Sequence, residues 1–272
     1  MPEVLSRVLT ELVLAIAIIA SLTGLELIAP VERISIQSRV RGLILRCVGG
    51  LAGAALLYIF HRGWAALGVT PLIRIPISGL LGNVIGAGLG LIFADFCGYW
   101  NHRFQHRFLW PIHAVHHSIT ELSAAACYGH FLERGLQFLL FALPLSLVSF
   151  EWAPLPFVIV ALRSISESYI HSPTKLSLGP ASILFVDNRY HRIHHSIEAQ
   201  HAGKNFGVLL SIWDRMFGTI RVPTAAEWPR TGIVGQPPPR TLVDYLLFPA
   251  RVISAAPSRM PESPTERPRR SA

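Results

Sequence analysis

The feature that most constrains this chain is the clustering of its histidines, which lie between long apolar segments. One pair has the spacing HxxxH, and two later groups share the spacing HxxHH. At these offsets a helix brings the rings together on neighbouring turns. Imidazole is the commonest metal-binding side chain, and eight rings exceed the four ligands of one tetrahedral ion. The sequence therefore predicts a site with two metal ions. The histidines concerned are His102, His106, His113, His116, His117, His191, His194 and His195.

The composition indicates a membrane protein. Hydrophobic residues make up 51% of the 272 residues and charged residues only 15%, against roughly 25% in soluble domains. The net charge of +8 is carried mainly by arginines that flank apolar segments. Arginine in that position holds loops on the cytoplasmic side of a membrane, so we expect no nucleic-acid partner. The three cysteines suggest no disulfide framework, and we interpret them as buried or inert thiols.

Three apolar segments are long enough to cross a bilayer. We expect an uncleaved anchor helix over residues 12–31, a second span over 42–60 and a third over 75–94. Residues 135–162 are apolar but interrupted by Glu151 and by prolines, which favours a helical hairpin that enters the membrane and returns. The predicted fold class is therefore all-α: an integral membrane helical bundle of three spans plus a hairpin, capped by a cytoplasmic His-rich helical metal site.

The charge that follows the first span predicts the orientation. Four arginines lie between residues 33 and 46 with no acidic residue among them. The positive-inside rule places this loop, and two crossings later the histidines, in the cytoplasm, with the N-terminus on the opposite side. We divide the chain into an N-terminal membrane-spanning region (1–94), a histidine-bearing domain that includes the hairpin (95–221), and a Pro- and Arg-rich tail (222–272) whose end we expect to be disordered.

The type of ligand favours iron without settling the choice. The clusters offer nitrogen, with almost no carboxylate and no thiolate among them. Imidazole suits iron, zinc, copper and nickel. A hydrolytic zinc pair usually mixes carboxylates with imidazole, because bridging oxygens bring the cations close together. A nearly all-nitrogen set instead leaves open positions for dioxygen on a redox-active metal.

The motifs HRFQH, HAVHHS and HRIHHS, in this order, resemble the three histidine boxes of the fatty acid hydroxylase/sterol desaturase superfamily, whose members are membrane-bound non-haem di-iron enzymes. The resemblance runs from Asp95 to Thr219, through DFCGYWNHR before the first box and NFGVLLSIWDRMFGT after the third. It implies iron bound by all eight histidines and by His171, which fits a family position after the hairpin. Glu167, four residues before His171, stands where the family often has asparagine or histidine.

Other residues near the boxes are candidates for contact with the metals or with their ligands. His130, in YGHFLE, resembles a family position, and His201 precedes the NFG sequence. Asp95 falls on the same helical face as the first box, where a carboxylate can orient a ring N–H. We interpret Trp213 and Asp214 as packing residues.

The resemblance implies an O2-dependent oxidoreductase that hydroxylates or desaturates an unactivated C–H bond of a membrane lipid. It implies two iron ions (Fe2+/Fe3+) as cofactor and O2 as co-substrate. The sequence has no haem or flavin motif, so we expect electrons from a separate protein of cytochrome or ferredoxin type. The alternatives are a zinc-dependent membrane hydrolase and a divalent-metal transporter, which would need ionisable residues within its spans. The sequence leaves open the lipid (sterol-like, fatty acyl, carotenoid or alkyl-glycerol) and the oligomeric state.

We predict that His194→Ala abolishes activity and lowers the amount of bound metal, because only a few ligands hold each ion. His61 stands apart from the three boxes. His61→Ala should therefore leave both quantities nearly unchanged. Turnover and metal content measured on the same preparations test this, and full activity in His194→Ala would contradict the predicted set of ligands.

Overall fold

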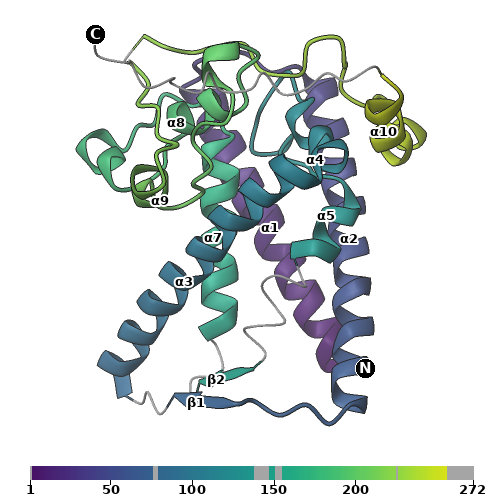
Figure 1. The fold of residues 1–272 in the computed structure, drawn as a ribbon, viewed down its shortest axis with the longest axis vertical. Helices are drawn as coiled ribbons and strands as arrows, with labels where there is room; N and C mark the ends of the chain where they lie inside the picture. Colours follow the sequence, from purple (N-terminus) through teal and green to yellow (C-terminus); the bar gives the residue numbers. More distant parts are fainter. Residues whose placement is uncertain (1, 76–78, 138–146, 151–154, 225, 256–272) are drawn as a thin grey trace, which may run out of the picture.

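The structure, a computed structural model, describes residues 2–75, 79–137, 147–150, 155–224 and 226–255. Long helices run along the molecule, and shorter helices gather at one end of them (Figure 1). In chain order the elements are α1 (Pro2–Ile28), α2 (Ile36–Ala66), β1 (Ile73–Ile75), α3 (Gly79–Phe108), α4 (Trp110–His117), α5 (Phe131–Gln137), β2 (Val148–Phe150), α7 (Leu155–Ile170), the 3-10 helix η2 (Gly179–Ile183), α8 (Asn188–His194), the 3-10 helix η3 (Ala199–His201), α9 (Ile212–Met216) and α10 (Leu242–Ser254).

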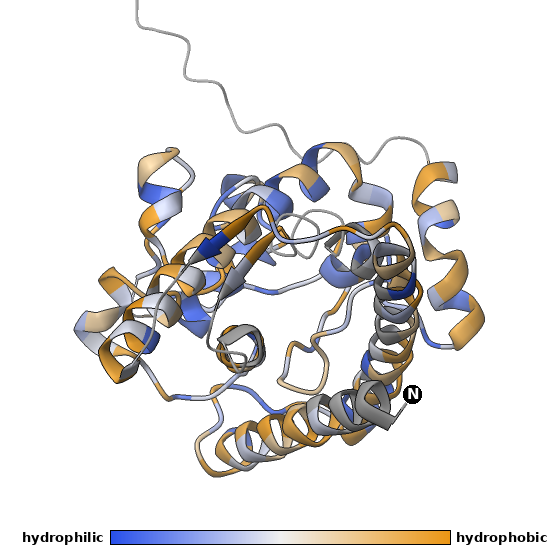
Figure 2. Cartoon of the chain, turned by 90° about the horizontal axis from the view of Figure 1, so that it is seen from below, coloured by the Kyte–Doolittle hydropathy of each residue, from blue (hydrophilic) through white to orange (hydrophobic). Residues whose placement is uncertain are grey.

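Two helices of the described residues, α2 and α3, are long and apolar enough to cross a membrane. α1 contains a shorter apolar helical stretch, Leu12–Ile28. The long helices carry hydrophobic residues along most of their length (Figure 2), and many of these side chains, such as Leu51 and Leu80, are exposed. Such a surface is typical of a protein that associates with a membrane. The predicted helical bundle is therefore confirmed in outline, while the count of three spans stays a prediction.

α3 joins a candidate span to the first histidine box without a break. The sequence predicted that the third span ends at Ala94, but the 30-residue helix continues past this residue to Phe108 and includes His102 and His106. At 1.5 Å per residue, His102 stands about 35 Å from Gly79, which exceeds a hydrocarbon core of about 30 Å. The next helix, α4, opens with Pro111, whose missing N–H is tolerated in a first turn.

The connection from α5 to α7 reaches the end of the bundle opposite the short helices. β2 pairs in parallel with β1, with Ile73 opposite Val148 and Ile75 opposite Phe150. β1 lies in the connection between the two candidate spans, α2 and α3. The strand β2 therefore lies at the same end of the bundle as that connection (Figure 1). The all-α prediction missed this small sheet, because three-residue strands are too short to show a period of two. Parts of the predicted hairpin, residues 138–146 and 151–154, lie outside the described residues.

A buried carboxylate ties the first two helices to the end of the molecule where the short helices gather. Glu26, near the end of α1, pairs with Arg39 of α2. It also accepts hydrogen bonds from the backbone N–H of Ala124 and from the hydroxyl of Ser172, both at 2.7 Å. Ser172 directly follows His171, so α1 helps to fix the segment that carries this histidine. Removal of one partner from such a pair leaves an uncompensated buried charge.

The segment after residue 222 packs against the rest of the molecule. A capping box at Thr241 starts α10, whose Tyr245 and Phe248 are completely buried in a core that α4 also lines. Because α4 carries three of the histidines, α10 supports the region that holds them. The division of the chain at residues 94 and 221 stays a prediction, and residues 256–272, where we expected disorder, lie outside the described residues.

We predict that Phe248→Ala lowers the free energy of unfolding by about 3–5 kcal/mol, because it leaves a cavity between α10 and α4. Leu247→Ala is the matched control, since this neighbouring side chain is 59% exposed. It should change stability by less than about 0.5 kcal/mol. Thermal unfolding of the purified variants in detergent measures the difference, and equal midpoints would contradict the packing of α10.

Candidate metal centre

The nine predicted histidines converge where α3, α4, α7 and α8 meet, at one end of the bundle (Figure 1). Their rings form two groups, and within each group the ligand nitrogens all lie within 4.8 Å of one another. All nine residues are buried. The five-histidine group comprises His102, His106, His113, His117 and His194, and the four-histidine group comprises His116, His171, His191 and His195. Residues from distant parts of the sequence are thus brought together, and their role as metal ligands is a proposal taken up below.

Helical geometry explains how each HxxHH box contributes to both groups. Residues i and i+4 of a helix differ by about 40° around the axis, whereas residue i+3 lies about 60° to the other side. α4 gives His113 and His117 to the five-histidine group and His116 to the other. In the box on α8 the assignment is reversed. His194, at i+3, belongs to the five-histidine group, and His191 and His195 belong to the four-histidine group. The two groups therefore lie next to each other.

Five rings are oriented by an oxygen acceptor at Nδ1. An oxygen of a carbonyl or carboxylate only accepts, so the proton lies on Nδ1 and Nε2 keeps a lone pair. This is the tautomer that binds a metal through Nε2, and such partners fix the plane of the ring. The pairs are His102 with the Phe206 carbonyl (2.9 Å), His116 with Tyr128 (3.1 Å), His194 with Lys204 (2.8 Å), His171 with Glu167 (2.6 Å), and His113 with the Glu133 carboxylate (3.3 Å).

The Nε2 atoms face one another at distances that fit a shared cation. Nε2 of His116 lies 3.2 Å from Nε2 of His171, and both rings carry their proton on Nδ1. Two lone pairs this close repel each other unless a cation lies between them. Nitrogens about 2.1 Å from one ion are about 3.0–3.4 Å apart. Further Nε2 atoms are buried without a hydrogen-bond partner among the described residues: those of His102, His113 and His117. The donor set therefore fits two cations, because unsatisfied buried polar atoms are otherwise costly.

Aromatic side chains cover the five-histidine group. The ring of Trp110 lies 5.4 Å from that of His106 and 5.3 Å from that of His117, measured between centroids. The ring of Phe206 lies 5.0 Å from that of His106. Such a cover excludes water, which strengthens electrostatic interactions inside the group.

Asp214 has a positioning role that the sequence analysis missed. Its carboxylate accepts hydrogen bonds from the backbone N–H groups of Phe206 (2.9 Å) and Gly207 (2.7 Å) and from the Thr219 hydroxyl (2.6 Å). Because the Phe206 carbonyl orients His102, Asp214 acts on that ring through the backbone. The signal in the sequence was an acidic residue in an otherwise apolar stretch, since a fully buried carboxylate needs partners of this kind.

Asp95 has a different role from the predicted one. Its carboxylate accepts hydrogen bonds from the backbone N–H groups of Leu209 (3.1 Å) and Leu210 (3.0 Å) and from the indole of Trp213 (2.8 Å). It therefore ties α3 to the segment that follows the third box and does not orient a histidine ring. Trp213 packs as predicted but also donates this hydrogen bond.

Three further candidates lie outside both groups. His201 is buried, and its Nε2 lies 3.1 Å from the carboxylate of Glu227. The side chain of Glu167 pairs with Arg163 at 3.3 Å. His130 packs with its ring 5.1 Å from that of Tyr245, between centroids. None of the three contributes a nitrogen or oxygen to the two groups in the part of the chain that the structure describes.

Burial keeps most of the rings neutral at pH 7. Desolvation lowers the pKa of His116, His117, His191 and His195 well below the ordinary value, and neighbouring histidines lower it further. Desolvation lowers the pKa of His194 to about 3. Neutral imidazole is the form that binds a metal, so these rings are ready to act as ligands.

His171 differs from the other rings because of a neighbouring thiol. Burial lowers the pKa of His171, but the contacts with Cys127 and with the Glu167 carbonyl raise it. The net effect is a pKa above the ordinary value. The Cys127 sulfur lies 3.3 Å from Nδ1 of His171, and the three cysteines are free. Cys127 is therefore a neighbour of a candidate ligand rather than an isolated thiol.

These observations define a membrane-associated helical protein with a buried, histidine-rich centre for two cations. Residues 87–219 match the family model of fatty acid hydroxylases, a region that contains all nine histidines. Through this region the chain belongs to the fatty acid hydroxylase/sterol desaturase superfamily, as its histidine boxes predicted.

Curated relatives have the same affiliation. The chain is 33% identical over 153 residues to ornithine lipid hydroxylase OlsE of Rhizobium tropici. This alignment covers 54% of the chain and 45% of the hydroxylase. It is 31% identical over 134 residues to alkylglycerol monooxygenase of Danio rerio (48% and 29% covered). It is 32% identical over 141 residues to a Delta(7)-sterol 5(6)-desaturase of Gibberella zeae (50% and 37% covered). The match thus spans less than half the length of each relative. No solved structure matches the chain.

We predict that the metal-free protein loses stability as the pH falls below about 6.5, the ordinary pKa of histidine. A ring with a lowered pKa stays neutral in the folded state, whereas the same ring takes up a proton in the unfolded chain. The unfolded state therefore binds more protons between about pH 6.5 and the folded-state pKa, which is about 3 for His194. The free energy of unfolding therefore decreases as the pH is lowered through this window. Thermal unfolding of metal-free protein at several pH values tests this, and a midpoint that does not change between about pH 7.5 and 5 would contradict it.

Proposed function

We propose that this protein is a membrane-bound, O2-dependent oxidoreductase that hydroxylates an unactivated C–H bond of a lipid with the help of two iron ions. The observation that carries the proposal is the pair of buried imidazole groups, five and four rings, whose nitrogens face one another. It occurs in a chain whose relatives include lipid hydroxylases and monooxygenases. The balanced reaction inserts one oxygen atom into the C–H bond and releases the other as water, using two electrons and two protons from outside.

In this proposal the five-histidine group holds one iron ion and the four-histidine group holds the other. When bound, the iron pair supplies the redox chemistry that activates O2 toward a C–H bond. The protein's own residues orient five of the imidazoles through their Nδ1 partners, and burial keeps most of the rings neutral. Trp110 and Phe206 keep water away from the five-histidine group. Fewer than six nitrogens per ion leave coordination positions for O2.

The composition of the groups favours this proposal over a zinc hydrolase or a metal transporter. No carboxylate oxygen belongs to either group among the described residues. The carboxylate of Glu133 reaches the five-histidine group only as a hydrogen-bond acceptor for His113. The bridging oxygens that hydrolytic metal pairs commonly use are therefore missing from the described ligand set.

The substrate is proposed to be a membrane lipid. The names of the relatives refer to an ornithine lipid, alkylglycerols and a sterol. Since one of them is a desaturase, the same centre is also compatible with introducing a double bond, and the position of the target carbon decides between the two outcomes. Sterol-like, fatty acyl, carotenoid and alkyl-glycerol lipids form the panel to be assayed.

We propose further that the metal centre faces the cytoplasm and receives electrons from a separate cytochrome- or ferredoxin-type protein. The arginines just before α2 and in its first turns support this orientation. Ser35, which directly precedes α2, donates its hydroxyl to the carboxylate of Glu121, three residues after Ser118 at the end of α4. The arginines and the histidines thus belong to the same end of the molecule, and the positive-inside rule assigns that end to the cytoplasm.

We predict that the purified protein binds two iron ions per chain and that a ligand substitution in either group removes one of them. His106→Ala tests the five-histidine group and His171→Ala the four-histidine group. His201→Ala is the matched control, because this histidine is buried but belongs to neither group. It should retain two ions. Metal analysis gives the count, and O2 consumption with a lipid panel should fall by about 100-fold or more in both ligand variants.

Labelled oxygen separates the candidate functions. With 18O2, a hydroxylated lipid carries the label, whereas a hydrolase product takes its oxygen from water. Zinc in place of iron together with product formation without O2 would overturn the proposal, and so would unchanged iron content in both ligand variants.

A further inference from the structure

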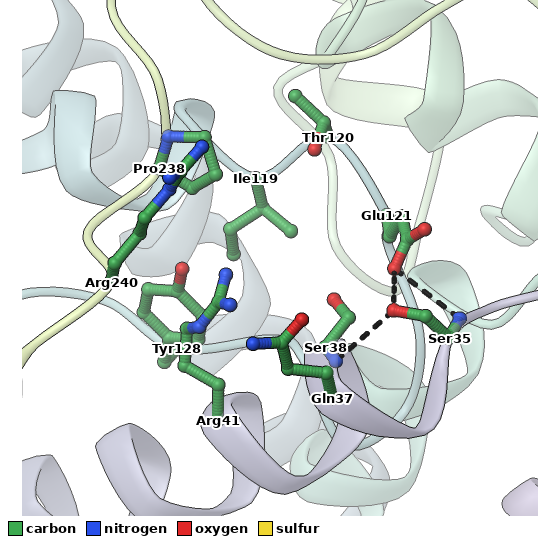
Figure 3. A pocket seen from close by; sticks show the side chains of 10 residues that line it. All are labelled: Ser35, Gln37, Ser38, Arg41, Ile119, Thr120, Glu121, Tyr128, Pro238 and Arg240. Atoms are coloured by element: carbon green, nitrogen blue, oxygen red, sulfur yellow. Dashed lines mark hydrogen bonds between the residues drawn. The ribbon is translucent and has the colours of Figure 1, made fainter.

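A polar pocket of about 410 Å³ lies near the histidine groups and contains none of them. It is formed by the N-terminal turn of α2, the segment after α4, and residues just before α10 (Figure 3). The pocket is connected to the metal centre through Tyr128, which lines it and whose backbone carbonyl accepts the hydrogen bond from His116. Neither the family match nor the proposed oxidation of lipids assigns a ligand to this pocket.

Two guanidinium groups line this pocket without a counter-charge of their own. Arg41 and Arg240 form no ion pair and no side-chain hydrogen bond in the part of the chain that the structure describes. The one acidic residue that lines the pocket, Glu121, accepts hydrogen bonds from the hydroxyl (2.6 Å) and the backbone N–H (3.3 Å) of Ser35, so its single negative charge stands against the positive charges of the two arginines. The N-terminus of the 31-residue helix α2 adds partial positive charge at the same place. The pocket is therefore electropositive.

The hydroxyl of Tyr128 is an independent sign of a ligand. The residue is only 4% exposed, yet its hydroxyl has no hydrogen-bond partner among the described residues. Figure 3 shows this side chain beside those of Arg41 and Arg240. Because this hydroxyl has no partner among the described residues, it is available to donate a hydrogen bond to an acceptor bound beside the two guanidinium groups.

We propose that this pocket binds a phosphate group. Guanidinium groups match the oxygens of phosphate in pairs, and the Tyr128 hydroxyl and the helix N-terminus supply further donors. The volume exceeds that of phosphate alone, so the phosphate belongs to a larger molecule, either a lipid headgroup at the membrane surface or a soluble phosphate ester. The two sources share the same chemistry of recognition, and the experiment separates them.

The experiment uses the full-length, metal-loaded protein in a maltoside detergent, which contains no phosphate. Calorimetric titration with inorganic phosphate should give saturable binding. Arg41→Gln and Arg240→Gln should each weaken it by about tenfold or more, because each removes a charged donor. Tyr128→Phe removes one hydroxyl and preserves the packing, so it should weaken binding several-fold. Arg74→Gln, an equal loss of charge on an exposed residue of β1, is the matched control and should bind as the unmodified protein does.

Soluble short-chain lipids identify the source. Tighter binding of dihexanoyl phosphatidic acid than of inorganic phosphate, lost in the same variants, supports a lipid headgroup. Binding of inorganic phosphate without binding of the short-chain lipid supports a soluble phosphate ester. The proposal is overturned if inorganic phosphate does not bind saturably, if the three pocket variants bind it as the unmodified protein does, or if Arg74→Gln weakens it equally. Metal content measured on each variant shows whether the centre is intact, so failure here is distinguishable from failure of the proposed oxidation.

Discussion

The repulsion between imidazole lone pairs that face each other inside the protein is the constraint on which the rest of the structure depends. His116 and His171 both hold their proton on Nδ1 and present Nε2 atoms 3.2 Å apart, away from water. Without a cation this arrangement costs free energy, and with one it becomes two bonds to a metal. The surrounding fold therefore has to hold nine imidazole rings at short distance in a buried environment, and five of them are oriented by an oxygen acceptor at Nδ1.

The carboxylates of this protein act mainly on the backbone and on charged side chains. Asp214 holds the loop whose carbonyl orients His102, Asp95 ties that loop segment to α3, and Glu26 connects α1 to the residue after His171. Each carboxylate is buried. The donors to Glu26 and Asp95 come from segments distant in sequence, whereas those to Asp214 come from the neighbouring loop. The two groups consist of imidazoles alone among the described residues, because the acids act one step away, where they fix geometry without bringing negative charge into either group.

The membrane-associated helices are directly continuous with, or packed against, the segments that carry the histidines. α3 extends from a candidate span into the first histidine box, α7 ends one residue before His171, and α10 packs behind α4. A centre built on the ends of such helices suits the proposed oxidation of a membrane lipid, because a candidate span leads directly into it. The electropositive pocket around Arg41 and Tyr128 lies at the same end of the molecule. The backbone carbonyl of Tyr128 accepts a hydrogen bond from His116 of the four-histidine group. A phosphate bound in this pocket would lie next to Tyr128, the residue that orients the ring of His116.

The sequence by itself determined the membrane character of this protein, its helical fold and the eight histidines of the three boxes, because hydropathy and helical spacing are local properties that can be read along the chain. His171 stands alone in the sequence, and the resemblance to the family pointed to it. Only the tertiary structure decided how HxxHH boxes divide between the two groups, since residue i+3 and residue i+4 point to different sides and the packing of α4 against α8 selects the partners. It also decided the tasks of Asp95 and Asp214 and the pairing of β1 with β2. The contacts of Asp95 and of β1 join residues far apart in the sequence, for which spacing carries no information. The contact of Asp214 with Phe206 spans only 8 positions, but it depends on a loop conformation that no periodic pattern encodes.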